Sequence, residues 1–417
     1  MSQSIDSSNQ FDITIVGGGM VGISLALLLA AQQRWKILVI ESKAIAASHK
    51  TQYSSSFDAR STALSWSSRS ILQKMAIWQH IEQQAQAISS IHVSDRGHFG
   101  LTRLEAEEAG VDALGFVVEN SWLGSVLIEQ SKQANISLKD SAKIISIQPK
   151  SQSMDLVIDV EGQRQLISSK LLVVADGADS TCAKKLGISQ QRNAYGDSAI
   201  IANISLQQAH NKVAYERFTD QGPMALLPLT DFENEHRCAL VWTQPSEQAD
   251  SLVASDDSEF LSQLQARFGD RLGKFKRVGE RVCYPLALTT SEEQVRRRLV
   301  VVGNAAHSLH PVAGQGFNLS LRDLDCLAQC LANQPQQTDV GELEPLLGYQ
   351  KQRENDQRNT LIFTDNLTKL FGLSSSAVAL GRNSGLLMMD LVPTLRNQFA
   401  HFGMGSAQSG VDHGYSV

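Results

Sequence analysis

A glycine-rich turn near the start of the chain constrains the fold more than any other feature. The turn, GGGMVG at 17–22, follows an apolar run at 11–16 and precedes an Ala- and Leu-rich run at 21–31. A second short apolar run, KILVI, covers 36–40. Short, uninterrupted apolar runs are typical of parallel strands buried on both faces. The order strand, turn, helix, strand predicts the first unit of a doubly wound α/β sheet.

The spacing of the glycines predicts a binding role for this turn. In a G-x-G-x-x-G turn, Gly17 permits the tight bend, Gly19 lets a pyrophosphate approach the main chain, and Gly22 lets the helix pack closely. Glu41 ends the second strand, 19 residues after Gly22, where a carboxylate accepts hydrogen bonds from ribose hydroxyls and repels the extra phosphate of NADP. We therefore expect the ADP half of a dinucleotide here, with a chance glycine turn as the alternative.

A second glycine-rich segment decides between FAD and NAD. The segment, GNAAHSLHPVAGQGFN at 303–318, follows the apolar run LVVV at 299–302 and leads into a run with apolar residues at helical spacing. Such a helix start offers backbone amides and the positive end of the helix dipole, which stabilise the anion of a reduced flavin. The segment favours FAD, with a purely structural glycine-rich loop as the alternative.

The middle of the chain has a different pattern. Segments such as Ala199 to Leu206 and Cys238 to Thr243 alternate in polarity, which is typical of an antiparallel sheet with one exposed face. We expect that sheet to belong to a second domain and the chain ends to fray. The expected regions are a discontinuous FAD-binding domain (11–80, 120–196 and 289–345), a substrate domain (81–119 and 197–288), a helical C-terminal region (346–402) and flexible ends (1–10 and 403–417).

Composition excludes several classes of partner. The net charge of -6 gives no broad cationic field, so we expect no nucleic acid. Five scattered cysteines without a C-x-x-C motif indicate a reducing cytoplasm, and we expect no metal site at Cys326 and Cys330. Residues 1–10 lack the features of a signal peptide, and the apolar run at 23–31 is too short to span a bilayer. Any membrane contact is therefore expected to be peripheral, on the inner face.

Three motifs in the same order resemble the class A flavoprotein aromatic hydroxylases. They are the turn at 17–22, the Asp176-Gly177 turn of VVADGADS, and the segment 303–318. The resemblance spans nearly the whole chain and implies a Rossmann-like FAD domain of the p-hydroxybenzoate-hydroxylase type, an antiparallel-sheet substrate domain and a helical tail. Four segments are most similar to the ubiquinone-biosynthesis branch, and within it to the 2-polyprenyl-6-methoxyphenol hydroxylases: Asp58-Ala59-Arg60, HVSDRG (92–97), GPMALLPL (222–229) and 303–318.

The resemblance assigns roles to individual residues. Asn304 stands where the family motif has an acid that bonds the ribityl chain, and an amide can also bond a hydroxyl. Asp176 would orient flavin contacts, with an ordinary Asp-Gly turn as the alternative. Arg60 would face the flavin or the electron donor, with a surface salt bridge as the alternative. Relatives carry a cofactor-supporting arginine near Ser121, and this chain has none there. The remaining expected cofactor-binding residues are Gly303, Pro311, Gly314, Gly316 and Asn318.

The implied enzyme reduces FAD with NAD(P)H, forms a flavin hydroperoxide with O2 and hydroxylates a polyprenylated phenol of ubiquinone biosynthesis. No second G-x-G-x-x-G follows the first, so we expect the donor to bind transiently. The alternatives are a flavin oxidase or reductase of the same fold, a hydroxylase of the same pathway acting at another ring carbon, and a noncatalytic FAD-binding subunit of a biosynthetic assembly. We expect a cytoplasmic protein, with contact to the membrane or to other quinone-biosynthesis proteins.

Four further segments have two interpretations each. His307 and His310 are weak candidates for taking the phenolic proton, with a structural, hydrogen-bonded role as the alternative. GPMALLPL at 222–229 is a candidate pocket wall or plain sheet core, and LLMMDL at 386–391 is a candidate Met-rich surface or helix packing. The run Arg296-Arg297-Arg298 is predicted to be a solvated turn, with donor phosphates or a membrane surface as weaker alternatives.

Overall fold

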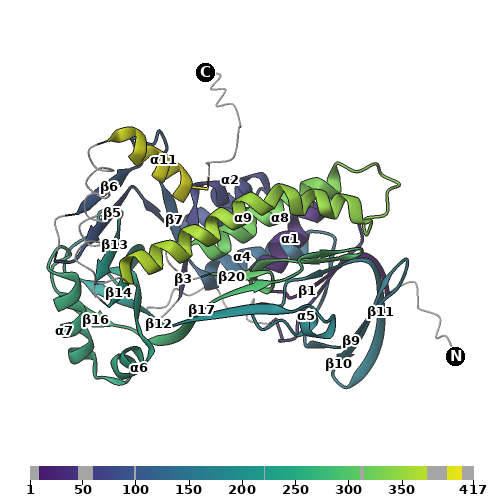
Figure 1. The fold of residues 1–417 in the computed structure, drawn as a ribbon, viewed down its shortest axis with the longest axis horizontal. Helices are drawn as coiled ribbons and strands as arrows, with labels where there is room; N and C mark the ends of the chain where they lie inside the picture. The colour runs from purple at the N-terminus through teal and green to yellow at the C-terminus, as the bar shows by residue number, and fades with distance from the viewer. Residues whose placement is uncertain are drawn as a thin grey trace.

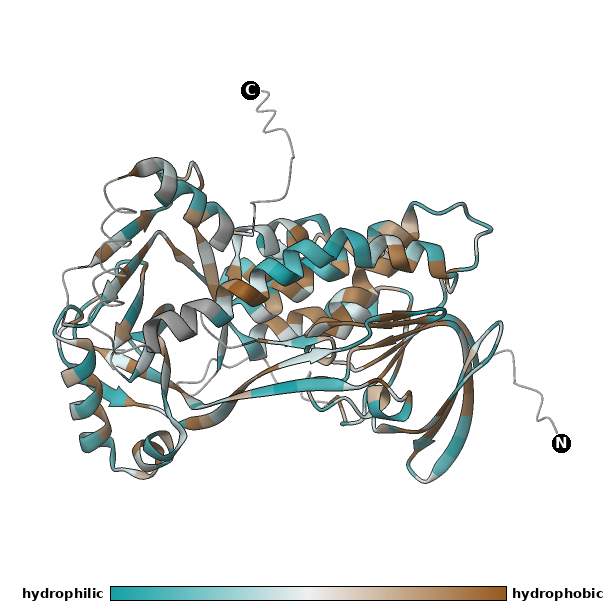
Figure 2. Ribbon diagram, in the orientation of Figure 1, coloured by the Kyte–Doolittle hydropathy of each residue, from teal (hydrophilic) through white to brown (hydrophobic). Residues whose placement is uncertain are grey.

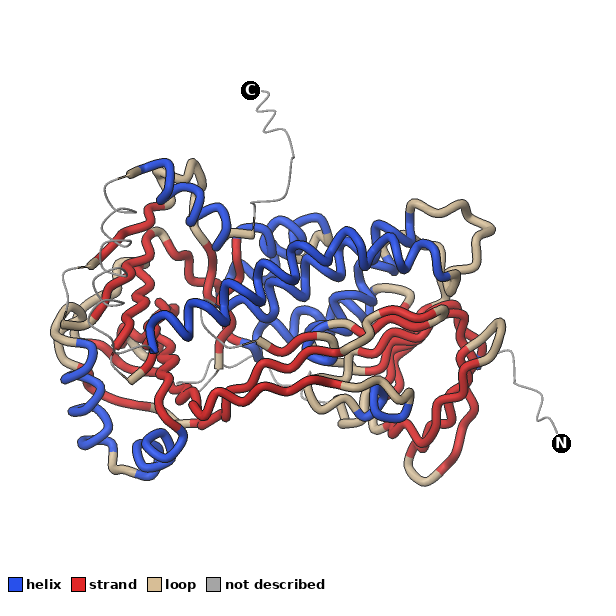
Figure 3. Tube along the Cα trace, in the orientation of Figure 1, coloured by secondary structure: helices blue, strands red, loops and turns tan. Residues whose placement is uncertain are grey.

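The computed structural model describes residues 9–45, 60–97, 100–219, 221–309, 314–372 and 392–405. Figure 1 shows an elongated molecule with a layer of helices over a parallel sheet at one end and a second sheet at the other. Figure 3 shows long strands that run from beneath the helical layer into this second sheet. None of the helices within these ranges is long and apolar enough to cross a membrane.

The first sheet has a parallel centre in the order β19-β11-β1-β2-β8. Ile13 of β1 pairs with Leu171 of β11 on one side and with Ile37 of β2 on the other. Strands from three distant parts of the sequence are thus neighbours, and their carboxyl ends meet at one edge. The strands of this sheet are β1 (Gln10–Val16), β2 (Ile37–Ile40), β8 (Ile136–Lys139), β9 (Ala142–Pro149), β10 (Met154–Val160), β11 (Gln163–Val174), β18 (Val295–Arg296) and β19 (Leu299–Val301).

Apolar side chains fill both faces of this sheet. Ile13 and Ile15 pack with Leu25 and Leu324 of the helical layer, whereas Leu38 and Leu172 face a second core beneath. Figure 2 shows the parallel strands as largely hydrophobic. The helices are α1 (Met20–Ala30), α2 (Trp66–Lys74), α3 (Trp78–Ile81), α4 (Asn120–Gln133), α5 (Thr181–Lys185), α6 (Ser246–Ala254), α7 (Asp257–Phe268), α8 (Gln315–Ala332), α9 (Leu343–Gly372) and α11 (Pro393–Gly403), with 3-10 turns η3 (Glu82–Gln84) and η4 (Gly303–Ala305).

The second sheet has the order β20-β17-β12-β15-β14-β13-β5-β6. Its pairs are antiparallel except for β13 with β5, and one face packs on α6 and α7 through Trp242 and Phe260. A small third sheet has the order β3-β7-β4. The strands are β3 (Ser61–Ser65), β4 (Ala85–Ile88), β5 (Ser90–Asp95), β6 (Leu101–Glu105), β7 (Gly115–Glu119), β12 (Gln190–Leu206), β13 (Val213–Thr219), β14 (Gly222–Phe232), β15 (Glu235–Pro245), β16 (Phe275–Val278), β17 (Val282–Ser291) and β20 (His307–Ser308).

The predicted α/β architecture and its first strand, turn, helix and strand are confirmed. Two local predictions are wrong. The second sheet was expected to have one face exposed to solvent, but the face opposite α6 and α7 lines a cavity. Arg298 is buried rather than solvated, because it pairs with Asp339 and donates to the carbonyl of Lys170 at 3.0 Å. The domain boundaries stay a prediction, and residues 386–391 lie outside the described residues.

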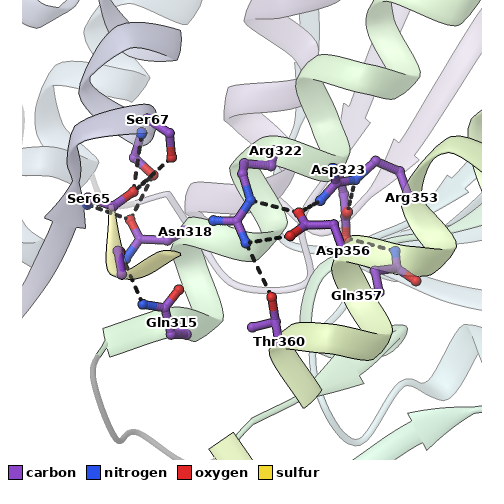
Figure 4. A network of polar contacts seen from close by, with 12 residues as sticks. Ser65, Ser67, Gln315, Asn318, Arg322, Asp323, Arg353, Asp356, Gln357 and Thr360 are labelled. Atoms are coloured by element: carbon purple, nitrogen blue, oxygen red, sulfur yellow. Dashed lines mark hydrogen bonds and ion pairs between the residues drawn. The ribbon is translucent and has the colours of Figure 1, made fainter. Parts of the chain in front are cut away.

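A buried polar network fixes α8 against its neighbours. Asp323 of α8 accepts a hydrogen bond from His307 Nε2 at 2.7 Å and one from Arg353 Nε of α9 at 2.6 Å. Arg353 also pairs with Asp356, which accepts from Arg322 at 2.8 Å, as Figure 4 shows. Burial by itself would raise the pKa of Asp323, but the hydrogen bond and charge of His307 and the charge of Arg353 hold that pKa below its usual value.

The start of α8 is anchored separately by Asn318. Its Oδ1 accepts from the Ser65 amide at 2.8 Å and from Ser68 Oγ at 2.7 Å. Its Nδ2 donates to the carbonyls of Ala63 at 2.9 Å and Gly314 at 2.7 Å. All hydrogen-bonding capacity of this amide is therefore used to tie the second glycine-rich segment to β3 and α2. Figure 4 shows Asn318 beside Ser65.

We predict that Asp323→Asn lowers the free energy of unfolding by about 3–5 kcal/mol, because it removes the charge from a buried ion pair and leaves Arg353 short of a partner. Urea unfolding monitored by fluorescence measures the change. The pKa of Asp323 lies below 3.8 in the folded protein, so its contribution is present above that pH and is lost as the pH falls further.

The matched control is Asp325→Asn, since Asp325 lies on the same helix in a long pair with the exposed Lys74. That variant should change stability by less than about 1 kcal/mol. Equal losses in the two variants, or a difference between Asp323→Asn and the parent that does not shrink in acid, would contradict a stabilising role for the buried pair.

Candidate functional site

The first glycine turn is packed too closely for side chains at three of its four glycines, including Gly18, where a Cβ would lie 2.8 Å from Glu41 Cβ. A Cβ at Gly17, whose φ is +113°, would lie 2.2 Å from the carbonyl oxygen of Ala175. A Cβ at Gly22 would lie 1.8 Å from the carbonyl oxygen of Gly17. A Cβ at Gly19 would meet nothing within 4 Å. The turn thus combines a tight helix-on-strand contact with open space beside Gly19, as the predicted binding of a pyrophosphate requires.

The helix that follows presents an unshielded positive end. The N-cap of α1 is Gly19, with no capping side chain and no acidic residue in the first turn. The first amides of a helix have no acceptor within the helix, and they carry the positive end of its dipole. Gly19, Met20 and Val21 line a cavity. This helix start therefore offers donors and positive potential to an anion.

Glu41 lies at the carboxyl end of β2, beside the glycine turn. Its Oε2 accepts from the Gly18 amide at 2.7 Å, and its Oε1 accepts from the Lys43 amide at 2.9 Å. The side chain is partly exposed; Oε1 also accepts from Ser42 Oγ at 3.1 Å, whereas Oε2 keeps a second lone pair. Glu41 is thus held in place by backbone donors and can still accept hydrogen bonds from ribose hydroxyls.

The second glycine-rich segment brings another helix start to the same cavity. Gly314, with φ +60°, precedes α8, which also has no capping side chain and no acidic residue in its first turn. Gly314, Gln315 and Gly316 line the cavity, and a Cβ at Gly316 would meet nothing within 4 Å. The two turns touch, since a Cβ at Gly303 would lie 2.9 Å from Val21 Cγ1. Two uncapped helix starts therefore face one space.

The cavity has a volume of about 1030 Å³. On one side are the two helix starts, and on the other is the face of the second sheet that α6 and α7 do not cover. The volume exceeds what one aromatic ring requires and suits a large cofactor ring together with a substrate. The apolar lining includes Ile91, Val93, Leu104, Ala214, Phe218, Ala225, Leu227, Ala239, Val241, Phe363, Phe399, Ala400 and Met404.

The segment GPMALLPL has both of its predicted roles. Ala225 and Leu227 of β14 line the cavity, whereas Met224 and Leu226 between them are packed in the core against α6 and α7. Because side chains alternate along a strand, one segment serves as pocket wall and sheet core at the same time.

Several predicted residues lie at the cavity. Arg60, Asn304 and Gly177 line it, and Asn304 is exposed there. Arg60 Nη1 donates a hydrogen bond to the hydroxyl of Tyr284, a partner that the sequence did not reveal. Asn120 also lines the cavity, next to the position of the arginine that this chain lacks, and its Oδ1 accepts from Thr62 Oγ1 at 2.6 Å.

Other predicted residues lie behind the cavity wall. Asp176 Oδ2 accepts from the Cys182 amide at 3.0 Å at the start of α5, and its buried Oδ1 has no hydrogen-bond partner among the described residues. Asn318 and His307 anchor the second glycine-rich segment and do not line the cavity. His310, Pro311, Asp58 and Ala59 lie outside the described residues. The roles of all these residues toward a cofactor stay predictions.

The second-sheet residues that close the cavity were not predicted from the sequence. Ala214, Glu216 and Phe218 of β13 all line it, and their spacing of two places them on one face of the strand. The alternation in AYERF was a usable signal, but the face that points to the cavity depends on strand pairing far along the chain. Phe399 of α11 and Met404 directly after it also line the cavity and were not predicted.

Comparison with known proteins assigns the family. A family described as FAD binding domain matches residues 10–361. The chain is 35% identical to an uncharacterized protein of Synechocystis (slr1300; 93% of this chain, 91% of the relative). It is 32% identical to the ubiquinone hydroxylase UbiL of Rhodospirillum rubrum (96% and 90%), and 28% identical to the human mitochondrial ubiquinone biosynthesis monooxygenase COQ6 (94% and 92%).

Solved structures show the same fold at low identity. The p-nitrophenol 4-monooxygenase PnpA of Pseudomonas putida matches with a TM-score of 0.75 at 16% identity, covering 96% of this chain and 99% of that one. PqsL of Pseudomonas aeruginosa matches with a TM-score of 0.72 at 20% identity, covering 91% and 100%. The glycine turns, the two uncapped helix starts and these matches together lead to one assignment: the chain belongs to the FAD-binding family of FAD-dependent monooxygenases.

Proposed function

We propose that this enzyme hydroxylates the aromatic ring of a polyprenylated phenol in ubiquinone biosynthesis. One observation carries the proposal: a single cavity has two helix N-termini on one side and an apolar sheet face on the other. The first side suits the charged and electron-rich parts of FAD, and the second suits an apolar aromatic ring. The printed names of two relatives, a ubiquinone hydroxylase and a ubiquinone biosynthesis monooxygenase, support the pathway.

In this proposal the residues at the two turns hold opposite ends of FAD. Gly17, Gly19, Gly22 and Glu41 hold the ADP half, because they combine open space, helix amides and a ribose-binding carboxylate. Asn304 and the helix start at Gly314 to Gly316 would hold the flavin end, with Arg60 and Asn120 lining the same cavity. FAD would supply the redox chemistry, with electrons from NAD(P)H and one oxygen atom from O2.

The protein's own contribution to the chemistry is to orient the phenol and to exclude water. Ala225, Leu227 and Ala239 form a wall without hydrogen-bonding side chains, and Phe399 and Met404 lie at the same cavity. Such a lining would exclude water from the site of oxygen transfer, where water would otherwise divert the reaction. The isoprenoid tail of the substrate is lipid-soluble, so we propose a cytoplasmic enzyme that works at the inner face of the membrane or in an assembly of quinone-biosynthesis proteins.

Deletion of the gene tests the proposed pathway. We expect a 2-polyprenyl-6-methoxyphenol to accumulate and the quinone to disappear, both measured by mass spectrometry of lipid extracts. Accumulation of a different polyprenyl phenol assigns the enzyme to another ring carbon. Normal quinone levels would exclude a role in this pathway. If the chain is a noncatalytic subunit, the purified FAD protein will show no bleaching of the flavin on addition of NADH or NADPH.

Two glycine variants separate packing from cofactor binding. Gly22→Ala should destabilise the fold by about 2 kcal/mol or more, because its Cβ would overlap the Gly17 carbonyl oxygen. Gly19→Ala should leave the melting temperature of the FAD-free protein unchanged, since its Cβ has open space, and should weaken FAD binding about tenfold because that space is left for the pyrophosphate. Fluorescence titration of FAD measures the affinity. An unchanged FAD affinity in Gly19→Ala would place the pyrophosphate elsewhere.

Glu41→Gln tests the predicted ribose contact. Glutamine keeps an acceptor for the Gly18 amide but loses the charge that strengthens hydrogen bonds from ribose hydroxyls, so we expect FAD affinity to fall about fivefold. Isothermal titration of the FAD-free protein gives the dissociation constant. Glu129→Gln, on the exposed side of α4, serves as the control and should bind FAD as the parent does. Equal FAD affinities for the parent, Glu41→Gln and Glu129→Gln would show that Glu41 does not contact the ribose.

A further inference from the structure

Glu216 is the acidic side chain of the cavity lining, and no other Asp or Glu among the described residues contributes to that lining. It lies in the middle of β13, between Ala214 and Phe218, which line the cavity from the same face of the strand. The neighbouring residue Tyr215 points to the opposite face, where its ring packs on Phe268 with centroids 5.4 Å apart. The carboxyl group of Glu216 therefore belongs to the cavity and not to the sheet core.

The strand register places Glu216 in an otherwise apolar row. Val93 of β5 and Ala225 of β14 are its direct neighbours across the sheet. Ala225 pairs with Val241 of β15, and Val241 pairs with Ile201 of β12. All five residues line the cavity. A carboxyl in such a row is unfavourable for folding unless a ligand uses it, because burial of a polar group without a partner costs free energy.

Glu216 has no hydrogen bond or ion pair with any of the residues that the structure describes. Burial raises the pKa of Glu216 to about 8. The other titratable side chain that the described residues contribute to the lining is Arg60, since the ring of Tyr215 lies on the opposite face, and Asp95 lies two residues after Val93 on the same face of β5. An unpartnered acid with a raised pKa in a large cavity is the arrangement expected of a group that meets a substrate.

We propose that the carboxyl group of Glu216 binds the phenolic hydroxyl of the substrate and accepts its proton during ring hydroxylation. The proposal rests on the proposed function. In the step, the phenol O–H bond breaks and an O–H bond forms on a carboxyl oxygen of Glu216. The electron pair stays on the phenol oxygen and makes the ring carbons ortho and para to it more nucleophilic. The transferred oxygen atom comes from O2, and the electrons come from NAD(P)H.

The geometry favours Glu216 over His307, and His310, the second histidine that the sequence offered, lies outside the described residues. His307 is buried away from the cavity lining, and its Nε2 is bonded to Asp323. The pKa of a phenol is about 10, and the raised pKa of Glu216 is closer to this value than the pKa of an exposed carboxyl is. The proton is therefore shared more evenly between the phenol oxygen and the carboxyl oxygen. Glu216 thus takes the role for which His307 was a candidate.

Two variants of the FAD-loaded enzyme test the proposal. Glu216→Leu removes hydrogen bonding and, because an apolar side chain suits this wall, should not lower the melting temperature. Glu216→Gln keeps a hydrogen-bonding group and removes the ionisation. The control is Glu105→Gln, at a carboxylate that bonds Ser90 and does not line the cavity. The probes are a phenol with a short isoprenoid tail and its methyl ether, with binding measured from the change in flavin absorbance.

We expect the parent and Glu105→Gln to bind the phenol about tenfold more tightly than the ether, and Glu216→Leu to bind both equally. In the parent the rate of hydroxylated product should rise with pH and level off above about 8 as Glu216 ionises. In Glu216→Gln the rate should fall about a hundredfold and lose this rise while phenol binding persists.

A Glu216→Leu enzyme that keeps both the preference for the phenol and the parent rate would overturn the proposal. So would a Glu216→Gln enzyme with the parent's rate and pH profile. If the parent itself forms no hydroxylated product from any polyprenyl phenol, the proposed function fails, and the role of Glu216 fails with it. The two failures are distinguishable, because one appears in the variants and the other in the parent.

Discussion

Two helices that begin without capping side chains face the same cavity, and much of the structure holds them in that position. Since β1, β11 and β19 are parallel neighbours, their carboxyl ends meet at one edge of the sheet, and the loops that follow must share that edge. The starts of α1 and α8 carry no acidic residue that would neutralise their positive ends. The positive potential at these two helix starts is therefore available to a ligand. A dinucleotide suits both, because its pyrophosphate is an anion and its ring is electron-rich.

The two helix starts are fixed by different means. α1 is held by close backbone contact, which only glycine allows at positions 17 and 22. α8 is held by polar side chains: Asn318 bonds the loop before it, and Asp323 joins it to His307 and α9. A polar anchor is directional and depends on every partner being present, whereas the glycine contact depends on space alone. We therefore interpret the polar network as a positioning device for the second turn.

The sequence sufficed for features whose causes are local. The glycine turn, the first strands and the antiparallel character of the second sheet follow from spacing and polarity over short windows. The roles of polar residues near the site were harder to predict from the sequence, because the side chains of Asn318 and Asp176 can bond a ligand or the backbone equally well. In the structure Asn318 bonds backbone groups at 63, 65 and 314, and Asp176 bonds the start of α5. Arg298 was misjudged because its partner Asp339 lies 41 residues away.

The cavity wall opposite the helix starts could not be predicted for a related reason. Alternation along β13 indicates that Ala214, Glu216 and Phe218 share a face, but pairing with β5 and β14 decides what that face meets. The same sheet shields its other face with α6 and α7. One space thus combines a positive rim, which suits the cofactor, with an apolar wall, which suits an aromatic ring and excludes water.

Isotopically labelled O2 gives the most direct measurement of the central claim that oxygen is transferred inside this cavity. The purified FAD enzyme is incubated under labelled O2 with NADH or NADPH and a polyprenyl phenol, and the mass of the product is measured by mass spectrometry. We expect a hydroxylated phenol with one labelled oxygen atom for each donor molecule oxidised. Consumption of donor with the label found solely in peroxide or water would contradict it and would make the protein a flavin oxidase.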